Sequence, residues 1–136
     1  MQYDLTQLGF LNVNWELEER HLPRDVDTHV WASALIWRAQ AGGAFAAVLK
    51  KGDPKRGDVL VKVSTMDGRA QVYGAAFSME GPQAFEKLPA GHTDMSEADA
   101  DAYLMKRRNQ DPDLWVIEIE DREGRHFLTE AVNRET

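Results

Sequence analysis

The residues best suited to chemistry are one lysine and three carboxylates on two apolar segments. Asp58 and Lys62 lie in the valine-rich run 58–64, and Glu118 and Glu120 alternate with isoleucine in the run 114–120. Carboxylates on one strand face can bind a cation or work as an acid–base pair, and Mg²⁺ prefers oxygen ligands. The simpler interpretation is a solvent-facing acidic strand in which Lys62 pairs with a nearby glutamate.

The spacing of these residues argues against a catalytic metal centre. A nuclease-type centre needs an acid, any residue and a lysine on the strand that follows Asp58, but the run 70–76 contains neither. The histidines show no ligand spacing, and the chain has no cysteine, which excludes thiolate catalysis and disulfides. We therefore predict no metal, no cofactor and no catalytic residue.

A second candidate site is the basic loop that follows the run 44–50. Lys50, Lys51, Lys55 and Arg56 surround two glycines, which suits contact with an anion or a nucleic acid. The net charge of −7 opposes such binding. No Walker-type sequence and no interleaved aromatic residue is present, so a solvated loop is the preferred interpretation.

The elements that must position these residues belong to an α+β domain. A helix is expected from Asp27 or Thr28 to Ala41, and Ser96 caps a second helix that Asp111-Pro112 ends. On this second helix Ala98, Ala102 and Met105 are expected to face the core, with Leu104 widening the stripe. The strands expected are a three-stranded antiparallel meander (44–50, 58–64 and 70–77, the last two joined by a turn at Asp67-Gly68), then 114–120 and a short final strand at 125–128.

Two parts of the chain remain open to alternative interpretations. Residues 78–95 form a long connection, either a lid over one sheet face or a surface excursion. Residues 1–25 form an N-terminal extension, either an extra edge strand or an arm, attached to a single domain at 26–136. The candidate interface residues are the alternating apolar residues of this extension and one helical tryptophan: Leu11, Val13, Trp15, Leu17 and Trp37.

The length and composition fit one globular domain. At 136 residues, with 43% hydrophobic residues, the chain is long enough to bury a core without disulfides. No apolar run has the length of a membrane span, and no signal peptide is visible, so no membrane association and a cytoplasmic location are expected.

Several tryptophan-centred segments carry a family resemblance. The segments 30–39, 43–45, 51–54, 59–63 and 113–122 resemble the bacterial family called domain of unknown function 1491, over about residues 30–128. The resemblance implies no activity, substrate or cofactor. Trp37 stands where that family is expected to have an arginine, and the N-terminal extension lies outside the match.

These observations favour a non-catalytic protein-interaction module, with a homodimer through the N-terminal strand as one form. The alternative is a nucleic-acid-binding protein, with or without cleavage, that uses Lys50, Lys51, Lys55, Arg56 and also Arg107 and Arg108. The order helix, three strands, helix, strand is also that of restriction-endonuclease-like, metal-dependent nucleases, but fold order alone does not establish that activity. The partner is therefore predicted to be a protein, self or other, and a nucleic acid is the second choice.

Overall fold

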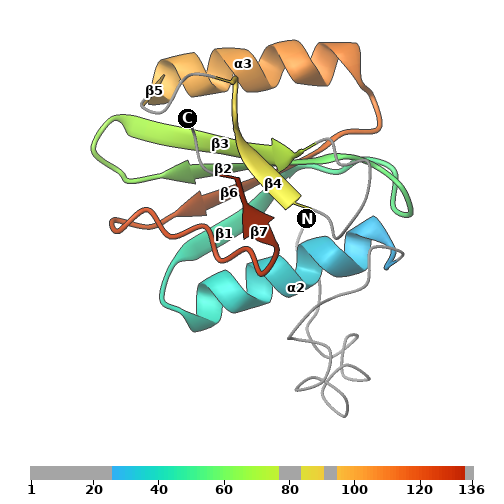
Figure 1. Cartoon of the computed structure of the whole chain (residues 1–136), viewed down its shortest axis with the longest axis horizontal. Coiled ribbons are helices and arrows are strands. Elements are labelled where there is room, and N and C mark those ends of the chain that lie inside the picture. The colour runs from blue at the N-terminus through green and yellow to red at the C-terminus, as the bar shows by residue number, and fades with distance from the viewer. Residues whose placement is uncertain (1–25, 77–83, 91–94, 134–136) are drawn as a thin grey trace.

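The computed structural model describes residues 26–76, 84–90 and 95–133 (Figure 1). The predicted N-terminal strand, with Leu11, Val13, Trp15 and Leu17, lies outside the described residues. Within them the chain is α+β, as predicted, with both expected helices. The elements are α2 (Thr28–Ala41), β1 (Phe45–Lys50), β2 (Val59–Ser64), β3 (Arg69–Ala75), β4 (Ala84–Leu88), β5 (Met95–Ser96), α3 (Glu97–Gln110), β6 (Trp115–Glu120) and β7 (Ala131–Val132).

The sheet is mixed, so the prediction of a simple antiparallel meander is wrong in part. The β2–β3 hairpin forms as expected, with Ser64 opposite Ala70 and Gly68 in the left-handed region at φ 90°. However, β6 lies between β1 and β2, antiparallel to the first and parallel to the second. The strand order is β1-β6-β2-β3-β4-β7, and β5 pairs with β3.

The loop from β1 to β2 passes over the start of β6, so that β6 can lie between these two strands in the sheet. The backbone N–H of Asp53 donates to the carbonyl of Asp113, and the N–H of Trp115 donates to the carbonyl of Asp58. A Cβ atom on Gly52 or on Gly57 would collide with the carbonyl oxygen of Asp113. The two glycines therefore let the loop pass closely over the start of β6, and they do not form a hairpin turn.

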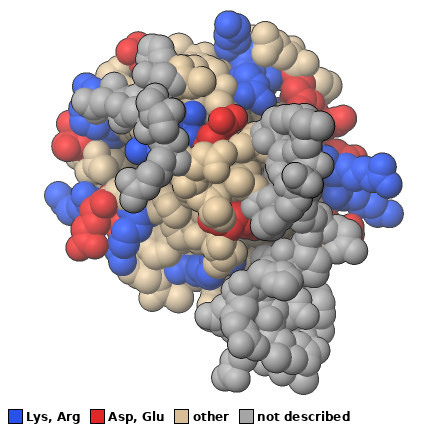
Figure 2. All heavy atoms as spheres, viewed as in Figure 1, with Lys and Arg blue, Asp and Glu red and all other residues tan. Residues whose placement is uncertain are grey.

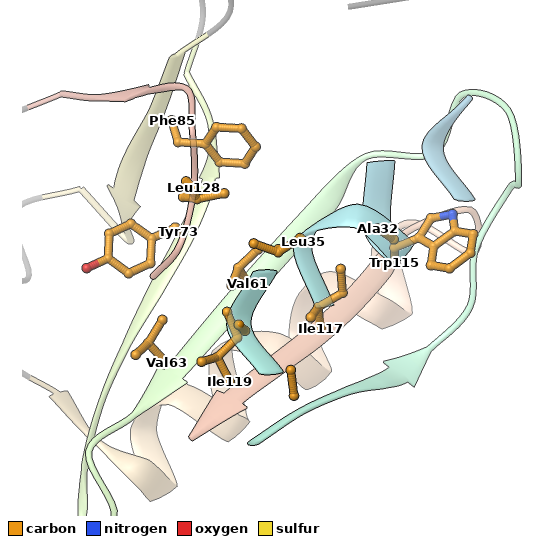
Figure 3. Packing of buried hydrophobic residues seen from close by; sticks show 12 residues of the cluster. Ala32, Leu35, Val61, Val63, Tyr73, Phe85, Trp115, Ile117, Ile119 and Leu128 are labelled. Carbon is orange, nitrogen blue, oxygen red and sulfur yellow. The ribbon is translucent and has the colours of Figure 1, made fainter. Parts of the chain in front are cut away.

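Each face of the sheet is covered by one helix (Figure 1). On one face α2 packs chiefly on β1 and β6. Ala32 and Leu35 of α2 pack there with the inward residues of the strands, among them Val61, Trp115 and Ile117 (Figure 3). This is the larger of the two cores, and it buries apolar side chains from five strands, β1, β6, β2, β3 and β4.

The other face is covered by α3, which packs chiefly on β2, β3 and β5. Ala100 and Leu104 are the buried residues of this helix, and they pack on Leu60 and Val116. The predicted inward stripe of Ala98, Ala102 and Met105 is wrong, because all three side chains are exposed. The rotation of the helix instead directs Glu97 and Asp101 towards the sheet, where both contact Lys62.

The described part of residues 78–95 extends the sheet. Ala84–Leu88 forms β4 beside β3, and Met95–Ser96 forms β5. The short final strand expected at 125–128 is wrong, since the chain there is irregular and Ala131–Val132 pairs in parallel with β4 instead. Neither described helix is long and apolar enough to span a membrane.

Candidate functional site

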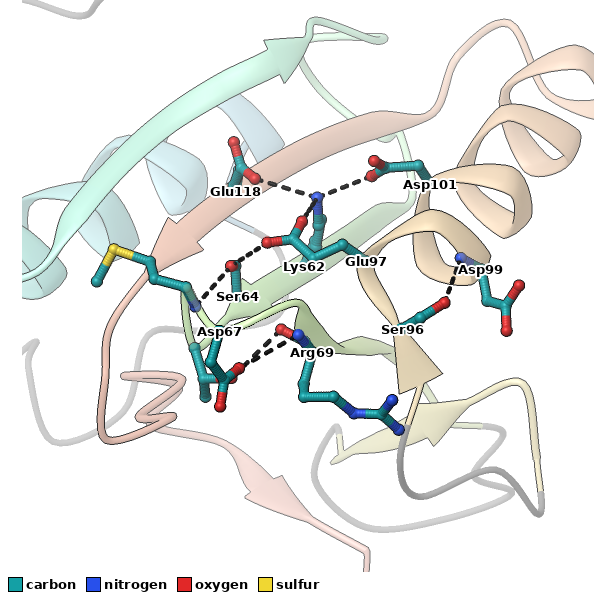
Figure 4. Close-up of polar contacts among 11 residues, drawn as sticks. Lys62, Ser64, Asp67, Arg69, Ser96, Glu97, Asp99, Asp101 and Glu118 are labelled. Carbon is teal, nitrogen blue, oxygen red and sulfur yellow. Dashed lines mark hydrogen bonds and ion pairs between the residues drawn. The ribbon is translucent and has the colours of Figure 1, made fainter.

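Lys62 is the centre of a polar cluster between β2 and α3. Alternation along β2 places Lys62 on the same face as Leu60, beneath α3, and its side chain is only 4% exposed. Its Nζ atom lies 2.7 Å from Oε1 of Glu97, 2.8 Å from Oδ1 of Asp101 and 3.2 Å from Oε2 of Glu118. The three N–H donors of the ammonium group are thus matched by three carboxylates (Figure 4).

Two different elements bring these carboxylates to Lys62. Glu97 and Asp101 are four residues apart and share one face of α3, whose first turn is fixed by the Oγ atom of Ser96 accepting from the N–H of Asp99 at 3.0 Å. Glu118 lies directly opposite Lys62 in the parallel pairing of β2 with β6. The cluster therefore ties α3 to two central strands.

The electrostatics keep Lys62 and Glu97 charged. Burial alone lowers the pKa of Lys62, but hydrogen bonds to Asp101, Glu97 and Glu118 outweigh it and hold the pKa above its ordinary value. The pKa of Glu97 is lowered, first by its hydrogen bond with Lys62 and then by the hydroxyl of Ser64, which donates to it at 2.5 Å. Lys62 is therefore a protonated counter-ion for the carboxylates.

The structure brings together only part of the predicted acidic cluster. Lys62 and Glu118 are paired, as the simpler interpretation proposed, but the expected solvent-facing outer strand is wrong, because β6 lies between β1 and β2 and the side chain of Glu118 is mostly buried. Asp58 is exposed and lies four residues before Lys62, and Glu120 lies on the same face of β6 as Glu118, one alternation further along the strand. Among the described residues, no group of three or more histidine, aspartate or glutamate side chains has the arrangement of a metal site.

Sequence reasoning missed Glu97 and Asp101. Their i, i+4 spacing at the start of α3 was a usable signal, because two acids one turn apart mark one helix face. Acidic residues in a first turn are also what the helix dipole favours, and the predicted apolar stripe of Ala98, Ala102 and Met105 lies one residue out of phase with Glu97 and Asp101. The charged partner of the buried lysine was therefore sought only on the strands.

Several hydrogen-bond donors of the basic loop already bond to oxygen atoms of the protein. Nζ of Lys50 donates to the carbonyls of Pro112 at 2.8 Å and Leu114 at 3.0 Å. The backbone N–H groups of Lys55 and Arg56 both donate to Oδ2 of Asp53, so they do not form a cradle for an anion. The charges of Lys51, Lys55 and Arg56 lie on exposed residues.

The start of α2 is closed by the same loop. The backbone N–H groups of Thr28 and His29 donate to the carbonyls of Lys55 and Pro54. An N-terminal helix end can bind an anion when its N–H groups are available. Here backbone oxygens already accept from two of them. Basic and acidic side chains are interspersed on the face drawn in Figure 2.

An apolar surface on β1 was not foreseen from the sequence. Ala46 belongs to the core under α2 and Val48 packs against it, so alternation directs Phe45 and Ala47 to the opposite face, where Phe45 is 56% exposed; Leu49 follows at a register shift and is 48% exposed. We define the β1 surface as Phe45, Ala47 and Leu49 together with Glu120 and Glu118, which lie opposite Phe45 and Ala47 on β6. The signal was that Phe45 and Ala47 alternate with Ala46 and Val48, so only one of the two sets can face α2.

The β1 surface lies at the edge of the described sheet. β1 has a described partner strand, β6, on one side only. The register shifts between Val48 and Lys50, which leaves Leu49 without a Cα partner on β6. Met105 on α3 adds a half-exposed apolar side chain one turn beyond Asp101. Trp37, the described member of the predicted interface, is 37% exposed on α2, which covers the other sheet face.

No curated protein matches this chain. A crystal structure and an NMR structure of a DUF1491 family protein from Caulobacter crescentus CB15 are 45% and 44% identical, with TM-scores of 0.72 and 0.71. The two matches cover 79% and 82% of this chain, and 99% and 100% of the Caulobacter chains. The solution structure of protein Atu0922 from A. tumefaciens is 33% identical, with a TM-score of 0.67, and covers 82% of this chain and 99% of its own.

The family model described as "protein of unknown function (DUF1491)" matches residues 26–129, which include both described helices and the central strands of the sheet. This agrees with the resemblance found in the tryptophan-centred segments. The chain therefore belongs to the DUF1491 family.

Proposed function

We propose that this protein is a non-catalytic binding domain that takes an extended segment of another protein as an additional strand beside β1. The observation that carries the proposal is the exposure of Phe45 and Leu49 on a strand with a described neighbour on one side only. An edge strand presents unpaired N–H and C=O groups, to which an extended peptide can add by main-chain hydrogen bonds.

The apolar side chains supply the second part of the binding energy. Isolated exposed apolar residues are ordinary, but Phe45 and Leu49 are both on one edge strand, four positions apart, and the small side chain of Ala47 lies between them. An added strand places its alternate side chains beside Phe45 and Leu49, where cross-strand apolar pairs contribute about 0.2–1 kcal/mol each. In strand addition, main-chain hydrogen bonds usually give the affinity, and side-chain contacts give the selectivity.

The arrangement around Lys62 supports binding over catalysis. The buried ammonium group is held by three carboxylates, and a lysine of this kind stays protonated and cannot serve as a general base. The cluster ties α3 to β2 and to Glu118 of β6, and Glu118 is part of the β1 surface. Its role in the proposal is to keep the surface rigid.

The test is a selection of extended decapeptides on the immobilised full chain, followed by NMR mapping of the bound peptides. We expect the largest shift changes in the amides of β1, and we expect Phe45→Lys to weaken binding about tenfold or more, since it places a charge in the apolar contact. Met66→Lys is the matched control, because Met66 is 44% exposed in the β2–β3 turn and not on β1. Peptides that shift another surface, or that bind the Phe45→Lys variant equally, would contradict the proposal.

A further inference from the structure

We infer that the segment bound at β1 is basic, with the pattern apolar residue, any residue, lysine or arginine, any residue, apolar residue. This inference rests on the proposed function and adds the chemistry of the partner. It follows from the position of Glu118 on β6, directly opposite Ala47 at the centre of the β1 surface.

The first step is the register of β1 and β6. Ala47 lies between Phe45 and Leu49 on β1, and directly behind it on β6 lies Glu118, with Glu120 behind Phe45. Neighbouring strands are about 4.8 Å apart, so a residue added opposite Ala47 lies two strand spacings from Glu118. Only the methyl group of Ala47 stands between them. A lysine or arginine side chain can lay its apolar stem across that methyl group and place its charge at the glutamate.

The second step is the charge balance of the surface behind β1. Glu97, Asp101 and Glu118 share the single ammonium group of Lys62, and Glu120 adds a further carboxylate on the same face of β6. Within this group one cation faces four acids, so negative charge remains in excess. The side chain of Asp101 is 59% exposed and that of Glu118 16% exposed, so Asp101 is the more accessible of the two to a cation from outside. A charge-assisted hydrogen bond there is stronger than a neutral one.

The third step compares the occupants that the chain itself could supply. A second copy would bring its own acidic surface, since the net charge is −7. The N-terminal extension has apolar residues at alternate positions over 11–17, so a strand that places them on the β1 surface offers no lysine or arginine to Glu118. A basic segment from a different protein is the occupant that the charges favour.

The experiment uses the full chain and three synthetic decapeptides that differ only in the central residue, which is lysine, glutamine or glutamate between two valines at alternate positions. Fluorescence anisotropy at low salt should give the lysine peptide an affinity about tenfold higher than the glutamine peptide, with the glutamate peptide weakest. Added salt should reduce the preference, because exposed charges are screened.

The matched variants separate this inference from the proposed function. Glu118→Gln and Glu120→Gln should each reduce the preference for lysine, whereas Glu86→Gln on β4, which removes the same charge four strands away, should preserve it. Equal binding of all three peptides overturns the basic partner but leaves strand addition standing. No binding of any peptide to the wild type, together with no effect of Phe45→Lys on peptides from the selection, overturns both. Concentration-dependent doubling of the mass in solution, abolished by Phe45→Lys, assigns the surface to a second copy and overturns the inference.

Discussion

At the scale of single residues, Lys62 should be the most sensitive charged position of the fold. Lys62→Met leaves Glu97, Asp101 and Glu118 facing one another without a cation. Removing one partner of a buried ion pair costs about 3–5 kcal/mol, but Glu97 and Asp101 are partly exposed, so we expect a loss of about 2 kcal/mol in the free energy of unfolding. Urea denaturation at neutral pH measures it.

The control for this variant is Lys55→Met, which removes an exposed cation and should change the free energy of unfolding by less than about 0.5 kcal/mol. Adding Glu97→Gln and Glu118→Gln to Lys62→Met should restore part of the loss, because the repulsion between the carboxylates is then relieved. An equal loss in the Lys55 and Lys62 variants would show that the cluster does not hold α3.

His126 should make the stability depend on pH. Its Nδ1 atom accepts from the N–H of Leu128 at 3.0 Å, and its ring meets that of Tyr73 edge to face at 5.1 Å. Burial first, and then the charge of Lys87, lower its pKa below the ordinary 6.5. The neutral ring is thus favoured by folding, so its contribution is fully present above pH 6.5 and is lost as the pH falls towards the folded-state pKa.

The measurement is the free energy of unfolding in urea between about pH 7.5 and 5.5, the range in which a histidine near its ordinary pKa changes charge. His126→Gln should flatten the fall in stability, and Lys87→Gln should reduce it in part, since the charge of Lys87 is the smaller cause. An unchanged slope in His126→Gln would assign the pH dependence to other groups.

The residue scale is also where prediction from the sequence had mixed success. The pairing of Lys62 with a strand glutamate was predicted from the alternation of both strands. Glu97 and Asp101 were not, because placing them required the rotation of α3 about its own axis, which Met105 and Leu104 leave ambiguous. The exposure of Phe45 was also missed, because it depends on which half of the sheet α3 covers.

At the scale of elements, the close passage of the β1–β2 loop over β6 can be tested at Gly57. A Cβ atom there would meet the carbonyl of Asp113 and the ring of Trp115. We expect Gly57→Ala to cost about 1–3 kcal/mol of unfolding free energy, the usual range for overpacking. Lys55→Ala in the same loop is the control, with less than about 0.5 kcal/mol expected. A neutral Gly57→Ala would mean that the loop can move away from β6.

This loop also explains how far the elements could be predicted. Both helices, the β2–β3 hairpin and the strand at 115–120 follow from capping residues, Asp67-Gly68 and alternation, all of which are local. The position of β6 between β1 and β2 is not local. It depends on contacts between residues about 60 positions apart, such as the Trp115 indole N–H donating to the carbonyl of Asp53 at 2.7 Å. Gly52 and Gly57 appeared as turn signals, although what they permit is a close backbone approach.

At the scale of the whole molecule, a chain that lacks residues 1–25 should fold and bind as the full chain does. Both described helices and every described strand lie in residues 26–133, and solved relatives are covered over 99–100% of their own length by 79–82% of this chain. The alternating apolar residues of the N-terminal extension, at 11–17, have no lysine or arginine among them, so this segment lacks the charge that the β1 surface favours. We therefore expect cooperative urea unfolding, an unchanged mass in solution, and peptide affinities within about twofold of those of the full chain.

The deletion distinguishes three occupants of the edge beside β1: the N-terminal extension of the same molecule, a second copy and a different protein. A marked rise in peptide affinity after the deletion would mean that the extension competes for β1 within the same molecule. A dimeric full chain that becomes monomeric on deletion would support the homodimer through Leu11, Val13, Trp15 and Leu17. Unchanged affinity and mass leave β1 to a partner from outside, because the negative charge behind Ala47 then remains unneutralised by any segment of this chain.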